Sequence, residues 1–71
     1  MKLAIVSGNY EQALVYAKEN NLQRQDWFYI SDPNTLMGMR EGKYVEVGTY
    51  YEKPEYFRIL EMLYINGFTK V

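Results

Sequence analysis

The sequence predicts one small α/β domain, in which a minimal three-stranded parallel sheet packs with two main helices and one short helix. Residues 2–7 form the first expected strand, and its centre, residues 3–6, is apolar without alternation, as in a strand covered on both faces. Strand-like and helix-like stretches then alternate along the chain, and this order favours parallel pairing. A chain of 71 residues has room for one domain, spanning 1–71.

The first helix is expected over residues 10–20. Gly8 permits the sharp turn that leads into it. Asn9 is a suitable N-cap, and Gln12 lies three positions further on, as a capping box requires. The asparagine pair that follows the helix can supply the left-handed residue that closes it.

A second strand is expected over residues 26–30, which are rich in strand-forming aromatic residues. Asp32 is a good cap and Pro33 a good first helical residue, so a short helix should follow, ending near residue 39. The third strand is expected over 44–48. Its apolar and polar residues alternate, which indicates an exposed face or a sheet edge.

A loop over residues 49–53 should lead into the second main helix. Pro54 suits the first turn of this helix, and Gly67 is the expected stop after it. Ile59 and Met62 widen its apolar stripe. The core-facing residues of the stripe are expected to be Tyr56, Phe57, Leu60, Leu63 and Tyr64.

The first strand is the most uniformly apolar of the three, so we expect it at the centre of the sheet. Right-handed crossovers then favour the strand order 2-1-3, with the two connections on opposite faces. A sheet of this size leaves two edges open. Homodimerisation through an edge or a helix is therefore a further expectation.

Two short segments of the chain resemble each other, residues 6–11 and residues 47–52. Each has a strand end, a glycine, a small polar residue, a tyrosine and a glutamate. The carboxyl ends of parallel strands are where ligands bind, at the point where strand order reverses. The candidate binding residues for a protein or a small ligand are therefore Gly8, Asn9, Tyr10, Gly48, Thr49, Tyr50 and Tyr51, with Ser31 and Asp32 nearby.

Two interpretations of this repeated pattern remain open. The glycines suit strand-to-helix turns on steric grounds alone. Alternatively, their loops hold a nucleotide or a phosphate, helped by the backbone N–H groups at the start of the first helix. The segment lacks the further glycines of a dinucleotide fingerprint and the Gly-Lys-Ser/Thr of a P-loop, and Glu11 would repel an anion there.

The composition excludes several classes of chemistry. The chain has no His and no Cys, so it lacks an imidazole base, a thiol nucleophile and the usual zinc ligands. Glu11, Asp32 and Glu52 are carboxylates that suit helix starts, and we expect no catalytic residue, no metal and no cofactor. The chain is therefore expected not to be an enzyme.

Charge and hydropathy restrict the partners and the location. The net charge is −1 and the signs are interspersed, which disfavours binding to duplex nucleic acid. The apolar runs are far shorter than the roughly 20 residues that span a bilayer. We therefore expect no membrane contact and, because cysteine is absent, a cytoplasmic location.

The chain contains eight tyrosines, too many to bury in so small a core with their hydroxyl groups satisfied. Tyr50 and Tyr51 lie in an expected loop and are the best candidates for exposure. Exposed tyrosine is favoured at protein interfaces. The leading hypothesis is therefore a non-enzymatic protein-interaction module, and the alternative is a small nucleotide- or phosphate-binding module that uses the Gly8 and Gly48 loops.

Three strand ends carry a resemblance to a known group of proteins. The segments 6–13 (VSGNYEQA), 29–33 (YISDP) and 47–52 (VGTYYE) together resemble the small Rossmann-like proteins encoded by tailed bacteriophages. Those proteins look like a P-loop core that has lost its phosphate loop. The resemblance implies a Rossmann-like fold, a phage or prophage origin in a host cytoplasm, and a host or phage protein as partner. It implies no activity and no functional residue.

Overall fold

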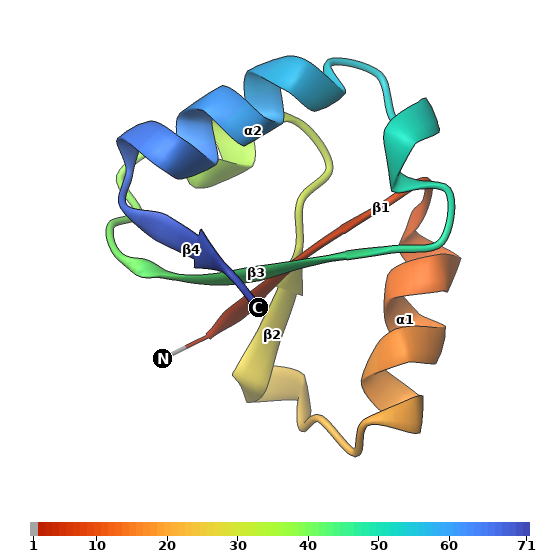
Figure 1. Ribbon diagram of the computed structural model, residues 1–71. Helices are drawn as coiled ribbons and strands as arrows, with labels where there is room; N and C mark the ends of the chain where they lie inside the picture. Colours follow the sequence, from red (N-terminus) through yellow and green to blue (C-terminus); the bar gives the residue numbers. More distant parts are fainter. Residues whose placement is uncertain (1) are drawn as a thin grey trace.

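The sheet has four strands, not the three that were predicted (Figure 1). The computed structural model describes residues 2–71. Its strands are all parallel and lie in the order β2-β1-β3-β4. The predicted order 2-1-3 is thus confirmed, and a further strand extends it. The strands are β1 (Leu3–Ser7), β2 (Trp27–Tyr29), β3 (Gly42–Val47) and β4 (Phe68–Lys70).

The two main helices lie on opposite faces of the sheet, as predicted from right-handed crossovers (Figure 1). The expected short helix is a 3-10 helix that already ends at Leu36, and part of the expected loop before α2 is helical too. The helices are α1 (Tyr10–Glu19) and α2 (Tyr56–Ile65), with the 3-10 helices η1 (Arg24–Asp26), η2 (Pro33–Leu36) and η3 (Tyr50–Glu52).

The central strand β1 supplies both layers of the core. Ala4, Ile5 and Val6 have no exposed surface. Because successive side chains of a strand point to opposite faces, Ile5 packs on the α1 side, whereas Ala4 and Val6 pack on the α2 side. The other buried residues of the α1 layer are Ala13, Ala17 and Trp27, and those of the α2 layer are Ile30, Leu36, Ile59, Leu63 and Phe68.

Local sequence signals set the ends of α1 and the end of α2. The side chain of Asn9 accepts a hydrogen bond from the backbone N–H of Gln12 at 3.0 Å, which confirms the predicted N-cap. Asn21, with φ 55°, is the left-handed residue after α1, and Gly67, with φ 82°, has the same role after α2.

The start of α2 and two of its predicted core residues differ from the prediction, whereas Tyr56, Leu60 and Leu63 pack in the core as predicted. The helix begins at Tyr56 rather than at Pro54, because Glu55 adopts a left-handed conformation with φ 60°. Phe57 and Tyr64, both expected in the core, are 82% and 84% exposed. The helix is apolar around most of its circumference, so its periodicity alone does not determine which face is buried.

The fourth strand also corrects the description of β3. It begins at Gly42, two residues before the predicted start, and it is an inner strand rather than an edge. Gly42 pairs with Phe68 of β4, and a Cβ atom on Gly42 would lie 2.7 Å from the Phe68 ring. The glycine therefore leaves room for the side chain that anchors β4 to the core.

Candidate functional site

The predicted site residues lie at one edge of the sheet, where β1, β2 and β3 end and the next elements begin. Parallel pairing is the reason why these segments share an edge. Their contacts nevertheless divide them into separate groups. The loops after β1 and β3 touch each other. By contrast, Ser31 and Asp32 form hydrogen bonds with Thr35, the former through its hydroxyl group at 3.1 Å.

The side chain of Gln12 joins the loops after β1 and β3. Its Oε1 atom accepts hydrogen bonds from the backbone N–H groups of Gly8 at 2.8 Å and Thr49 at 3.1 Å. Its Nε2 atom donates to Thr49 Oγ1 at 2.9 Å. We call this arrangement the Gln12 clasp. In a capping box Gln12 would bond back to Asn9, so the predicted box is only half formed and the glutamine side chain reaches across the sheet edge instead.

The clasp explains the two glycines of the repeated pattern. A Cβ atom on Gly8 would overlap Thr49 Oγ1, and a Cβ atom on Gly48 would lie 2.6 Å from Gln12 Cδ. Gly48 also has φ 58°, which disfavours any residue with a side chain. The glycines therefore allow the two loops to approach each other, and Gln12 fills the space in which a ligand was expected between them.

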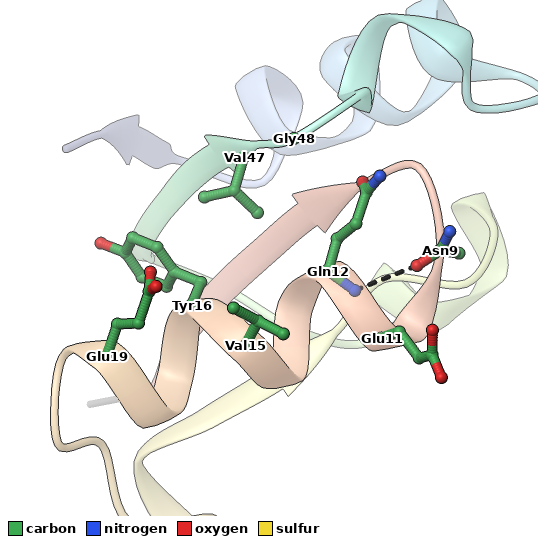
Figure 2. A pocket seen from close by; sticks show the side chains of 8 residues that line it. All are labelled: Asn9, Glu11, Gln12, Val15, Tyr16, Glu19, Val47 and Gly48. Atoms are coloured by element: carbon green, nitrogen blue, oxygen red, sulfur yellow. Dashed lines mark hydrogen bonds between the residues drawn. The ribbon is translucent and has the colours of Figure 1, made fainter.

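An open groove lies beside the clasp, between α1 and the end of β3, with a volume of about 450 Å³. Figure 2 shows the groove residues, which come from the cap residue Asn9, from α1 and from the Val47–Gly48 segment. Val15, Tyr16 and Val47 give it apolar walls, whereas Glu11 and Glu19 are its charged residues. The groove has no lysine or arginine in its lining, so it offers no positive charge to a phosphate.

The carboxyl end of β2 is covered by Lys53, which is not among the predicted site residues. Lys53 is only 5% exposed, and its Nζ atom donates a hydrogen bond to the Tyr29 hydroxyl group at 2.6 Å. The same ammonium lies 4.4 Å from the centroid of the Tyr29 ring. Tyr10 meets Tyr29 edge-on, at 5.6 Å between ring centroids, and stacks on Trp27. Tyr10 thus packs toward β2.

Four aromatic rings form a continuous row from η3 into α2. Neighbouring ring centroids are 5.4 Å apart for Tyr51 and Tyr50, 5.6 Å for Tyr50 and Tyr56, and 5.5 Å for Tyr56 and Phe57. Both ends of the row are exposed, Tyr51 at 62% and Phe57 at 82%. We call these four residues the aromatic row. The sequence predicted exposure for both Tyr50 and Tyr51, but Tyr50 is half-buried and packs against the core. It also placed Phe57 in the core.

A buried carboxylate holds the inner part of the row in place. Glu46 of β3 accepts a hydrogen bond from the Tyr56 hydroxyl group, and its Oε1 atom lies 2.8 Å from Lys70 Nζ. Burial raises the pKa of Glu46, but the hydrogen bonds from Lys70 and Tyr56 outweigh it, so this pKa lies below its ordinary value. Burial and the Glu46 carboxylate together raise the pKa of Tyr56. The carboxylate therefore links β3, β4 and α2.

No known protein family, curated protein or solved structure matches the chain. Within residues 2–71, no helix is long and apolar enough to cross a bilayer. The described residues also contain no group of three or more Asp or Glu side chains that could hold a metal ion. The function of the chain therefore has to be inferred from the chemistry of its surfaces.

Proposed function

We propose that the chain is a small protein-binding domain that contacts its partner through the aromatic row and the outer face of α2. The observation that carries the proposal is the exposure of Phe57 and Tyr64, at 82% and 84%. The two residues are seven positions apart and so lie on one face of the helix. Large exposed aromatic groups on one face are typical of protein contact surfaces.

The exposed face of α2 continues the aromatic row. Ile65 is 67% exposed and follows Tyr64 at the end of the helix. On the opposite face of the helix, Ile59 and Leu63 have no exposed surface. The helix therefore has an apolar side that fills the core and a second side on which three large apolar groups face solvent beside Arg58 and Glu61, which supports a role in binding.

The charges around this surface indicate the chemistry of the partner. Glu52, Glu55 and Glu61 are all exposed on or beside it. Arg58 is the cation beside these glutamates, and its Nη1 atom already lies 3.4 Å from Glu55 Oε1. We therefore infer a partner whose contact surface is apolar with a basic rim. A symmetric dimer would place the same acidic patch opposite itself, so we favour a different protein over a second copy.

A random peptide display library selected against the immobilised domain provides the test. We expect the enriched peptides to combine aromatic or aliphatic residues with Lys or Arg. Replacing Phe57→Ser and Tyr64→Ser together should weaken the binding of these peptides about tenfold or more, as truncation of an interface hot spot does. The resemblance to tailed-phage proteins makes host and phage proteins the first full-length partners to measure.

The matched control is Val15→Ser with Met37→Ser, which removes two exposed apolar side chains elsewhere on the molecule. This variant should bind the selected peptides as the wild type does. Equal losses in both double variants, or the absence of any enriched basic peptide whose binding the Phe57→Ser and Tyr64→Ser changes weaken, would each refute the proposal. Light scattering that shows a dimer which the Phe57→Ser and Tyr64→Ser changes dissociate would identify a second copy as the occupant instead.

A further inference from the structure

The outer edge of β2 is unpaired, because β2 is the terminal strand in the order β2-β1-β3-β4. The backbone N–H of Ile30 donates to Ile5 of β1, which shows which residues of this segment face β1. The N–H and C=O groups of successive residues point to opposite sides of a strand. Those of Phe28 therefore also face β1, whereas those of Trp27 and Tyr29 point away from it. Two N–H and two C=O groups are therefore directed toward the open edge.

A hollow of about 550 Å³ follows this edge. Trp27, Phe28 and Tyr29 all line it. Their side chains alternate between the two faces of the sheet, so a hollow that all three line has to run along the backbone edge between those faces. It therefore lies where an added strand would pair with β2.

The same hollow is positively charged, although the net charge of the chain is −1. Lys2 and Arg24 line it, and both are exposed. Neither of the two ion pairs within residues 2–71 involves them. No carboxylate lines the hollow; Asp26 lies close in sequence, but its side chain accepts a hydrogen bond from the Gln23 backbone. The cations are thus available to an acidic ligand.

We propose that the open edge of β2 binds an extended acidic peptide as a fifth strand of the sheet. The unpaired backbone groups would supply affinity, and Lys2 and Arg24 would select acidic side chains. A nucleotide fits less well, because the largest ring of the hollow, that of Trp27, offers no free face to a base. Trp27 is only 7% exposed, and Tyr10 stacks on it. This site is independent of the aromatic row and shares no residue with it.

The first experiment uses a capped peptide of alternating Glu and Val as the probe, with hydrogen exchange of the protein amides followed by NMR. We expect the peptide to slow the exchange of the Trp27 and Tyr29 amide protons. Two versions of the peptide, N-methylated on alternate sets of residues, should differ, because only one set of N–H groups faces β2. One version should retain binding and the other should lose it. Equal binding of both versions, or unchanged exchange at Trp27 and Tyr29, would overturn the proposal.

The second experiment tests the charge selection. Lys2→Glu with Arg24→Glu should abolish binding of the acidic peptide. Lys18→Glu with Lys43→Glu makes the same change of net charge at exposed positions elsewhere and should leave most of the binding intact. Equal losses in both variants would show unspecific attraction instead. Adenosine monophosphate that displaces the peptide from Trp27 and Tyr29 would assign the hollow to a nucleotide. The Phe57→Ser and Tyr64→Ser variant should bind the probe normally, so the two proposals fail separately.

Discussion

The side chain of Gln12 connects the loops after β1 and β3, and its partner Thr49 lies 37 positions further along the chain. Replacing Gln12→Leu would leave the partly buried N–H groups of Gly8 and Thr49 without an acceptor. An unsatisfied buried donor costs about 1–3 kcal/mol, and we expect a loss of unfolding free energy in that range. Urea unfolding followed by circular dichroism measures it.

Gln12→Glu is the informative companion of this variant. A carboxylate at position 12 keeps an oxygen acceptor for both backbone N–H groups, and the Thr49 hydroxyl group can rotate to donate to it. We expect Gln12→Glu to lose clearly less stability than Gln12→Leu. Equal losses would show that the clasp acts through packing rather than through its hydrogen bonds.

Substitutions at two glycines distinguish the energetic cost of backbone strain from that of steric overlap. Gly38 and Gly48 both have positive φ, at 80° and 58°. A Cβ atom on Gly38 would meet nothing within 4 Å, whereas one on Gly48 would overlap the Gln12 side chain. Gly38→Ala should cost about 1 kcal/mol from strain alone. Gly48→Ala should cost about 1–3 kcal/mol more, which denaturant midpoints can resolve. Equal costs would contradict the overlap.

The Glu46 carboxylate makes the fold sensitive to acid. Its pKa is lowered in the folded protein, so its contribution to the unfolding free energy is complete above the ordinary value of 4.5. That contribution is lost as the pH falls below 4.5 and through the lower pKa of the folded state. Stability measured by urea unfolding over a pH series should therefore decline less steeply in Glu46→Gln than in the wild type. An equally steep decline in both proteins would contradict the assignment.

At the scale of elements, the orientation of α2 gives a matched pair of neighbouring substitutions. Leu63 has no exposed surface, whereas Tyr64 is 84% exposed. Leu63→Ala should cost about 2–5 kcal/mol, because it leaves a cavity between α2 and the sheet. Tyr64→Ala should change the unfolding free energy by roughly 0.5 kcal/mol or less, as surface changes do. Thermal or urea unfolding distinguishes the two outcomes, and similar costs would refute the orientation.

The elements that were predicted correctly depend on local signals. The apolar run of β1, the Asn9 cap and the stop at Gly67 each involve residues close together in sequence. The exposure of Phe57 and Tyr64 was not predictable in this way, because contacts with other elements, such as the hydrogen bond from Tyr56 to Glu46, fix the rotation of α2. The fourth strand was missed because only four residues follow Gly67, and the sheet edge provided by β3 makes them a strand.

The candidate site, too, was predictable from the sequence only in part. Parallel pairing predicted which edge the loops would share, and that part holds. It did not predict that Gln12 would turn from its capping position to join them, because two geometries were open to the same side chain. Phe57 and Tyr64 were missed as surface residues because aromatic groups at helical spacing usually mark a core. The helix has more apolar residues than one buried face can hold, and this excess is the signal that could have identified them as exposed.

At the scale of the whole molecule, the two core layers share a single strand. Val6 of β1 packs in the α2 layer, and its neighbour Ile5 packs in the α1 layer with Trp27. A domain of 71 residues has roughly 4–10 kcal/mol of stability in total. Neither layer has enough buried surface to persist without the other, so the two layers should unfold together.

The one tryptophan of the chain makes this coupling measurable. Trp27 is buried in the α1 layer and reports on it by fluorescence, whereas circular dichroism reports on the helices of both layers. Leu63→Ala weakens the α2 layer only. If the layers unfold as one unit, this change should shift the fluorescence midpoint as far as the dichroism midpoint. A fluorescence midpoint that stays at its wild-type value while the dichroism midpoint falls would show that the layers unfold separately. In that case β1 would remain paired with α1 and β2 after the α2 layer has opened.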